Sequence, residues 1–174
     1  RVRSAARETI ADLRRDGIQR VILLSGDDTP TTRAVANAVG IDEARGDLLP
    51  QDKVAAVTEL TGSGAQVVMV GDGTNDAPAL TAATVGIAMA RHGGVTAEAA
   101  DAVLLSDDIA DVARAIHLSK RTMRIARQSI VAGLGASAVA MVFAALGMIP
   151  PTMGALLQEG IDVAVILNAL RASR

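Results

Sequence analysis

An acid-rich turn follows a short apolar run near the middle of the chain. Asp72, Asn75 and Asp76 come directly after the run Gln66–Val70, with Gly71 and Gly73 among them. Two carboxylates four residues apart at the end of a buried strand suit Mg²⁺, which takes one or two carboxylates beside phosphate oxygens and water. The glycines let the backbone turn sharply and approach a ligand closely. We therefore predict a magnesium and phosphate site here, with an ordinary Asp-Gly turn as the alternative.

Two further segments carry groups that bind phosphate. Ser25 ends an apolar run and offers a hydroxyl, and the backbone amides of Gly26 and Asp27 follow it. Successive amides of this kind form anion-binding concavities. Lys53 lies near the start of a predicted helix, where its charge could offset phosphate oxygens at the same sheet edge. The alternatives are a structural turn serine and a solvated surface lysine.

A second pair of carboxylates lies in the apolar last third of the chain. Glu159 and Asp162 are three residues apart, so a helix would place them on one face. Gln158 and Asn168 are further polar candidates in the same span. Carboxylates at membrane depth are costly and by default indicate ion pathways or proton relays. The alternative for Glu159 is a position near the outer membrane interface, where ionised carboxylates are tolerated.

The first two thirds of the sequence alternate between apolar runs and helical patterns. We predict strands over 20–25, 66–70, 85–89 and 102–105, with helices over 30–39, 50–61 and 77–83. Thr29 is a plausible cap for the first of these helices, and Pro30 and Pro50 suit first helical turns. Strands alternating with helices imply an α/β fold, with a parallel sheet covered by helices on both faces. Ligands bind at the carboxyl ends of such strands.

The composition changes after residue 119. A basic helix is predicted over 111–128, and no charged side chain then appears until Glu159. The ranges 130–149 and 152–170 are each long enough to cross the hydrocarbon core of a membrane, with a turn at Pro150-Pro151. Basic residues flank only the outer ends of this hairpin, which favours a cytoplasmic location for both termini of the chain. The alternative is a pair of helices buried in a large soluble core.

Composition excludes several classes of function. The chain has 174 residues with a net charge of −2, one phenylalanine, no tryptophan or tyrosine, and no cysteine. A near-neutral chain without aromatic platforms is a poor nucleic-acid binder, so nucleic acid is not an expected partner. Without cysteine there is no disulfide framework and no thiolate metal site or nucleophile.

Three motifs together resemble those of one family. Met69–Leu80, which reads Met-Val-Gly-Asp-Gly-Thr-Asn-Asp-Ala-Pro-Ala-Leu, resembles the hinge motif of P-type ATPases, a branch of the haloacid-dehalogenase-like superfamily. Leu24–Asp27 is similar to the Thr-Gly-Asp segment of that family, with serine in place of threonine. Leu49–Lys53 resembles its Pro-x-x-Lys segment, and the two apolar spans resemble the last membrane pair of the heavy-metal-transporting branch.

The resemblance implies a role for each motif residue. Asp72 would be a Mg²⁺ ligand, with Asn75 and Asp76 organising the phosphorylated site and Asp76 also near the Mg²⁺. Ser25, Gly26 and Asp27 would contact the phosphoryl group, and Lys53 would neutralise it. The reaction implied is phosphoryl transfer from ATP through an aspartyl-phosphate cycle. The Asp-Lys-Thr-Gly-Thr segment of the family, which carries the phosphorylated aspartate, is absent from this sequence. The rest of a parent ATPase is therefore an expected partner.

These observations predict a particular organisation and function. Residues 1–119 would form the carboxyl-terminal part of a phosphorylation domain, and residues 120–174 a basic linker helix and transmembrane hairpin. Glu159 and Asp162 resemble, without matching, the acidic last-helix motifs of zinc, cadmium and cobalt pumps. We predict ATP-driven export of a divalent transition metal across the cell membrane.

Three alternatives stay open at this point. The chain could belong to a potassium-pump subunit, because Gly-Thr-Asn-Asp also fits that group. It could be a non-catalytic membrane fragment that binds Mg²⁺ and phosphate, or a soluble phosphatase of the same superfamily. The predicted hairpin argues against the soluble phosphatase.

Overall fold

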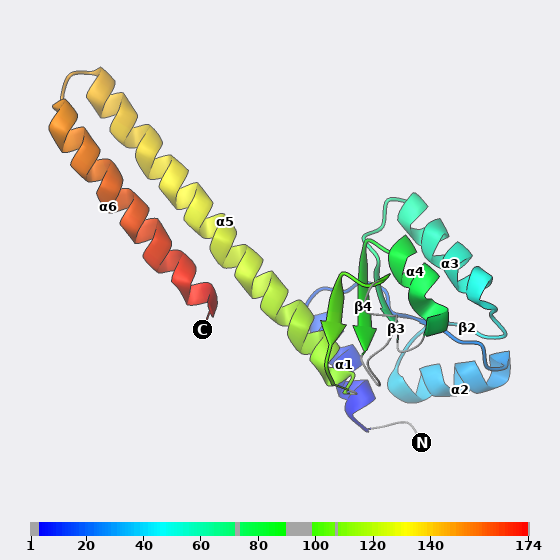
Figure 1. The fold of residues 1–174 in the computed structure, drawn as a ribbon. Helices are drawn as coiled ribbons and strands as arrows, with labels where there is room; N and C mark the ends of the chain where they lie inside the picture. The colour runs from blue at the N-terminus through cyan, green and yellow to red at the C-terminus, as the bar shows by residue number, and fades with distance from the viewer. Residues whose placement is uncertain (1–3, 72–73, 90–98, 107, 174) are drawn as a thin grey trace. The chain divides into compact units, whose positions relative to one another are not determined.

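A computed structural model describes residues 4–71, 74–89, 99–106 and 108–173 (Figure 1). The chain divides into two compact units, Arg1–Ala115 and Ile116–Arg174. The first unit contains short strands and helices, and the second contains two long helices.

The first unit has the predicted alternation of strands and helices. Its elements are α1 (Ser4–Arg15), β1 (Ile22–Leu24), α2 (Thr29–Val39), β2 (Glu43–Arg45), α3 (Pro50–Gly62), β3 (Val68–Gly71), the short 3₁₀ helix η1 (Thr74–Asp76), α4 (Ala77–Ala82), β4 (Val85–Met89), β5 (Ala102–Leu104) and the start of α5 (Ala110–Ala145). Each predicted strand is present: β4 has the predicted bounds, and the other three are somewhat shorter or shifted. The predicted α/β class is confirmed.

The strands form two parallel sheets, where the sequence predicts one. β1 pairs with β2, placing Ile22 opposite Glu43, and the second sheet has the order β3-β4-β5. Its central strand β4 is buried at Gly86, Ile87 and Ala88. Within the described residues β1 and β3 are therefore edge strands with one unpaired side each, and both are only partly buried.

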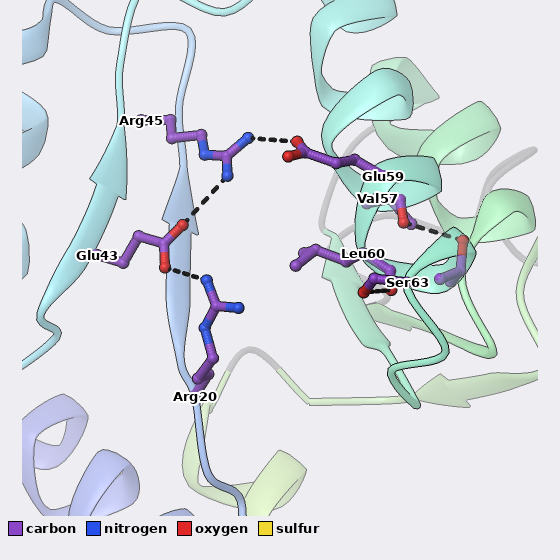
Figure 2. A network of polar contacts seen from close by, with 8 residues as sticks. Arg20, Glu43, Arg45, Val57, Glu59, Leu60 and Ser63 are labelled. Carbon is purple, nitrogen blue, oxygen red and sulfur yellow. Dashed lines mark hydrogen bonds and ion pairs between the residues drawn. The ribbon is translucent and has the colours of Figure 1, made fainter.

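Strand β2 is absent from the sequence-based prediction. Its three residues are Glu43, Ala44 and Arg45, a charged and short segment without the β-branched pattern that indicates a strand. Ion pairs explain how it is held: Arg20 and Arg45 both contact the carboxylate of Glu43, at 2.5 and 3.2 Å, and Arg45 also contacts Glu59 of α3 at 3.2 Å (Figure 2). Arg45 thus ties β2 to α3, and Glu43 ties it to the segment before β1.

Helix starts and ends differ from the prediction in two places. Helix α2 begins at Thr29, and the residue that caps it is Asp28, whose carboxylate accepts from the backbone N–H of Thr31 at 2.9 Å. The prediction that Thr29 caps this helix is wrong, because the side chain of Thr29 is bonded elsewhere. Helix α3 continues through Gly62, one residue beyond the predicted end.

Two groups of buried side chains form the core of the first unit. Ile10 and Leu13 of α1 are buried with Ala36 and Val39 of α2, two helices in contact with each other. A second group lies where α3 and α4 pack together and α4 covers β3 and β4; its buried members are Ala56, Val57, Ala79, Leu80, Ile87 and Ala88. The second group positions the acid-rich turn, because α4 follows that turn directly.

The second unit is a helical hairpin. The predicted basic helix and first span are one continuous helix, α5, and the second helix is α6 (Pro151–Ala169), followed by the 3₁₀ helix η3 (Leu170–Ser173). Both helices are long and apolar enough to cross a membrane, and large apolar side chains are exposed along both.

The turn of the hairpin is longer than the sequence predicts. Helix α5 ends at Ala145, not at Ile149, and Gly147 adopts a left-handed φ of 72°. The backbone N–H of Met148 then donates to the carbonyl of Phe143 at 3.0 Å, which satisfies an end carbonyl of the helix. The turn therefore begins several residues before Pro150-Pro151.

Candidate functional site

An ion pair joins two of the predicted phosphate-site segments. The Nζ atom of Lys53, near the start of α3, donates to Oδ1 of Asp76 at 2.8 Å. The two side chains are only 18% and 11% exposed. A pair of this burial is screened by water less than a surface pair, so each charge holds the other in place. The lysine and the aspartate were predicted separately, and the structure brings them together.

Gly71 leaves the space that Asp76 occupies. A Cβ atom at position 71 would lie 2.8 Å from Cβ of Asp76 and 3.1 Å from its Oδ2. These separations are closer than carbon atoms pack. Glycine at the end of β3 is therefore a packing requirement, which lets the turn fold back so that the carboxylate of Asp76 lies beside the strand end.

The loop after β1 is held by its own hydrogen bonds. The hydroxyl of Ser25 donates to Oδ2 of Asp27 at 3.0 Å, and the same hydroxyl oxygen accepts from the backbone N–H of Asp27 at 3.1 Å. The hydroxyl and one of the amides predicted to contact a phosphoryl group therefore bond to each other.

A second loop lies against this one and was not predicted as part of the site. The backbone N–H of Asp47 donates to the carbonyl of Asp27 at 2.6 Å, and that of Leu48 donates to the carbonyl of Ser25 at 3.1 Å. One carboxylate oxygen of Asp47 accepts from both the backbone N–H and the hydroxyl of Thr29, at 3.0 and 2.6 Å. These contacts cross between loops, so no spacing within the sequence indicates them.

Hydrogen bonds connect most of the predicted site in series. The loop of Ser25 and Asp27 bonds to the segment before α3, and α3 then carries Lys53 to Asp76. Asn75 lies in the same turn as Asp76 and is exposed. Asp72, the predicted Mg²⁺ ligand, lies outside the described residues.

Hydrogen bonds and neighbouring charges shift the pKa of two carboxyls near these loops. Hydrogen bonds from Thr31 lower the pKa of Asp28, the cap of α2. A hydrogen bond from Arg20, with smaller help from Arg45, lowers the pKa of Glu43 on β2. Both groups are therefore held in the ionised form that their hydrogen-bond donors require.

The hairpin carries a chain of polar contacts around Asp162. The hydroxyl of Ser137 on α5 donates to Oε1 of Gln158 on α6 at 3.0 Å. The amide nitrogen of Gln158 donates in turn to Oδ1 of Asp162 at 3.1 Å. Gln158 thus links the carboxylate of Asp162 to the neighbouring helix.

Glu159 takes no part in this chain of contacts. Its side chain is exposed, as is that of Asp162. In the part of the chain that the structure describes, no group of three or more His, Asp or Glu side chains is placed to hold a metal ion. The two predicted ion ligands therefore form at most a partial coordination sphere within this chain.

Two further contacts bring α5 and α6 close together. Asn168 donates to the hydroxyl of Ser129 at 2.8 Å, and Ser129 is only 4% exposed. A Cβ atom on Gly133 would lie 2.9 Å from Cγ2 of Val165. Small residues that let helices approach, with polar side chains that bond across them, are typical of helix pairs in membranes.

Comparison with known proteins agrees with the fold. Residues 1–84 match the family model of haloacid dehalogenase-like hydrolases. The whole chain also resembles a crystal structure of a zinc-transporting PIB-type ATPase in the E2.Pi state, with a TM-score of 0.89 and 40% identity over 99% of this chain and 28% of that one. The fold is thus that of a haloacid-dehalogenase-like domain followed by an apolar helix pair.

Two curated relatives align with almost the whole chain. The manganese-exporting P-type ATPase of Mycobacterium tuberculosis is 40% identical over 99% of this chain and 24% of its own length. The copper-exporting P-type ATPase of Staphylococcus aureus is 39% identical over 99% of this chain and 21% of its own length. Over almost its whole length the chain is similar to heavy-metal-transporting P-type ATPases, and it spans about a quarter of the length of these relatives. The named metals lend no support to the potassium-pump alternative.

Proposed function

We propose that this chain supplies part of the phosphoryl-transfer site and one membrane helix pair of an ATP-driven exporter of a divalent transition metal. The observation that carries the proposal is the partly buried ion pair between Lys53 and Asp76, which is joined through α3 to the loop of Ser25 and Asp27. A cation on α3, a carboxylate in the turn after β3 and a loop with amide donors after β1 are thereby connected. That combination can position and neutralise a transferring phosphoryl group.

Each group has a distinct task in this proposal. Lys53 offsets negative charge on phosphoryl oxygens, and its bond to Asp76 fixes where that charge lies. The hydroxyl of Ser25 and the amides of Gly26 and Asp27 donate hydrogen bonds to the same oxygens. Asn75 is exposed in the same turn as Asp76, and its amide would bond to the phosphorylated group.

The donor set fits Mg²⁺. Lys53 engages Oδ1 of Asp76, and the second oxygen, Oδ2, lies beside Gly71, next to the position of Asp72 in the chain. Asp72 and Asp76 would hold the ion with hard oxygen ligands. When bound, Mg²⁺ would neutralise charge on the phosphoryl oxygens. ATP would supply the phosphoryl group.

The open strand edges favour a parent chain that completes the site. Within the described residues β1 pairs only with β2 and β3 has only β4 as a neighbour, so each presents an unpaired row of backbone groups. Unpaired edges of apolar strands are usually paired or covered. We propose that another part of the parent ATPase supplies a strand here and carries the phosphorylated aspartate.

The exposed apolar surface of the hairpin favours a membrane location. Leu134, Met141 and Leu156 are among many large apolar side chains of α5 and α6 that are at least 60% exposed. Lipid would remove this surface from water. The basic side chains of α5 precede its apolar part and Arg171 follows α6, so we propose that both ends of the hairpin face the cytoplasm.

The polar contacts around Asp162 support ion transport through the hairpin. Asp162, Gln158 and Ser137 offer only oxygen and amide groups, and the sequence has no cysteine. Oxygen donors suit harder and borderline divalent ions better than Cu⁺. We propose Asp162 and Glu159 as ligands of the transported ion, with other helices of the parent ATPase completing the coordination sphere.

Metal-stimulated ATP hydrolysis by the parent ATPase in detergent tests this proposal. Zn²⁺, Cd²⁺, Co²⁺, Mn²⁺ and Cu⁺ would be compared on the wild type and on Asp162→Ala, with Gln158→Ala as a second variant. We expect stimulation by one or more divalent ions that is lost in Asp162→Ala. Stimulation by Cu⁺ alone, or full stimulation of Asp162→Ala, would show that the ion assignment is wrong.

A further inference from the structure

Asp47 makes three hydrogen bonds across two loops. Its backbone N–H donates to the carbonyl of Asp27 at 2.6 Å, and its Oδ2 accepts from the backbone N–H and hydroxyl of Thr29, at 3.0 and 2.6 Å. Asp27 and Thr29 lie on either side of Asp28, the cap of α2. Asp47 is therefore hydrogen-bonded to the carboxyl-terminal half of the loop that begins at Ser25.

The backbone at this position is unusual. Asp47 has a φ of 56°, the one positive φ of a non-glycine residue in the part of the chain that the structure describes. Left-handed backbone is uncommon outside glycine, although aspartate tolerates it better than most residues. Such conformations persist where the surrounding contacts hold them in place, and they occur often at functional sites.

The residue before Asp47 shows how closely the loops approach. A Cβ atom on Gly46 would lie 2.6 Å from Cα of Thr29 and 2.9 Å from the carbonyl oxygen of Asp27. A Cβ atom on Gly26 would lie 3.3 Å from the carbonyl oxygen of Leu48. The two loops are thus in backbone-to-backbone contact, and any larger residue at position 46 would separate them.

We infer that Asp47 is a positioning residue for phosphoryl binding. Three residues after it Pro50 begins α3, which carries Lys53 to Asp76. Asp47 consequently fixes the loop of Ser25, Gly26 and Asp27 relative to the helix that carries the cation. The inference rests on the proposed function, in which these two segments contact one phosphoryl group.

The inference predicts a selective effect on a phosphoryl analogue. Orthovanadate resembles a transferring phosphoryl group, so its binding reports the geometry of the donors around that group. Loss of the Asp47 carboxylate would let the loop move relative to Lys53, which weakens orthovanadate binding. ATP would still bind through its other contacts to the parent ATPase, so we expect the KM for ATP to stay unchanged.

The test compares four forms of the parent ATPase in detergent. Asp47→Gly removes the carboxylate and keeps a backbone that accepts positive φ, and Asp47→Asn keeps an acceptor oxygen of the same shape. Asp42→Gly is the matched control, because its carboxylate is 90% exposed and the same unfolded-chain entropy is added. The readouts are the orthovanadate concentration that halves ATP hydrolysis and the KM for ATP.

The expected result separates positioning from simple destabilisation. Asp47→Gly removes both bonds from Thr29 to the carboxylate. Because these bonds act on orthovanadate only through the loop, we expect about tenfold more orthovanadate to be needed, a factor at the lower end of the energy of a single hydrogen bond to a charged group, with an unchanged KM for ATP. Asp47→Asn should recover most of the wild-type inhibition, and Asp42→Gly should match the wild type. If Asp47→Gly folds poorly, Thr29→Val removes one of the same donors and should weaken inhibition in the same direction.

Two results would overturn the inference, and they are distinguishable. If the wild type hydrolyses ATP in an orthovanadate-sensitive manner and the Asp47 and Thr29 variants are inhibited equally well, only the positioning role fails. If the wild type shows no such hydrolysis, the proposed function fails and the positioning role fails with it.

Discussion

Replacing Lys53 with methionine should loosen the acid-rich turn by a measurable amount. The change removes the cation and leaves the carboxylate of Asp76 with an exposed side-chain fraction of only 11%. Removing one partner of an exposed ion pair costs about 0–1 kcal/mol, and removing one partner of a fully buried pair costs about 3–5 kcal/mol. The partial burial of this pair places its loss near 2 kcal/mol, between these two limits.

Hydrogen exchange on the parent ATPase measures this loss locally. Since about 1.4 kcal/mol corresponds to a factor of ten, amides in α4 and in the first turn of α3 should exchange roughly thirtyfold faster in Lys53→Met. The matched control is Arg14→Met, which breaks the ion pair between Arg14 and Asp42. Their side chains are 44% and 90% exposed, so we expect little change.

A double variant separates the stabilisation by the ion pair from the cost of burying an unpaired charge. Lys53→Met with Asp76→Asn leaves no unpaired charge, so its exchange should be slower than that of Lys53→Met alone. Exchange in Lys53→Met that is no faster than in Arg14→Met would refute the claim that this pair holds the turn.

Three further predictions follow from particular contacts. Gly71→Ala should displace Asp76, because the new Cβ would lie 2.8 Å from its Cβ. We expect the free energy of local opening, measured by hydrogen exchange, to fall by about 1–3 kcal/mol and ATP hydrolysis to be lost. Glu43→Gln should lower the thermal unfolding temperature at pH 7.5, and its difference from the wild type should shrink below pH 4.5. Gly133→Leu should separate the two helices of the hairpin and reduce metal-stimulated hydrolysis, whereas Gly135→Leu, which meets open space, should not.

The sign of the pH prediction follows from the direction of the pKa shift. Arginine neighbours hold the folded-state pKa of Glu43 below its usual value of 4.5, so the ionised form stabilises the fold at neutral pH. That stabilisation is complete above the unfolded-state pKa and is lost as the pH falls through the folded-state pKa. A difference between Glu43→Gln and the wild type that grew in acid would contradict this account.

The elements that sequence predicts best are those with a strong local signal. The apolar runs ending at Leu24 and Val70 predict β1 and β3 because buried parallel strands need continuous apolar residues. Strand β2 has no such signal, since Glu43 and Arg45 are held by ion pairs to α3 and to the segment before β1. Partners far away in sequence leave no local pattern.

The start of the hairpin turn could not be predicted from sequence for a different reason. Pro150-Pro151 marks a helix start so strongly that the predicted first span extends up to it. The structure ends α5 at Ala145 instead, since Gly147 takes a left-handed conformation and the intervening residues form the turn. A glycine at such a position is a helix-stop signal, but three glycines occur between residues 130 and 147, so the sequence alone does not single it out.

For the candidate site, sequence predicts the residue types better than their contacts. The motifs single out Lys53 and Asp76, but their spacing does not indicate that the two bond directly. Asp47 is absent from the predicted site because its partners, Asp27 and Thr29, belong to another loop. The roles of the site residues in phosphoryl transfer and of Glu159 in ion binding stay predictions.

Ion transport by the parent ATPase in sealed liposomes tests the central proposal most directly. ATP would be added outside, and accumulation of each divalent ion would be followed for the wild type, Asp76→Asn and Asp162→Ala. We predict ATP-dependent accumulation of a divalent transition metal by the wild type, and none by either variant. Undiminished accumulation by Asp162→Ala, or accumulation of Cu⁺ alone, would contradict the proposal.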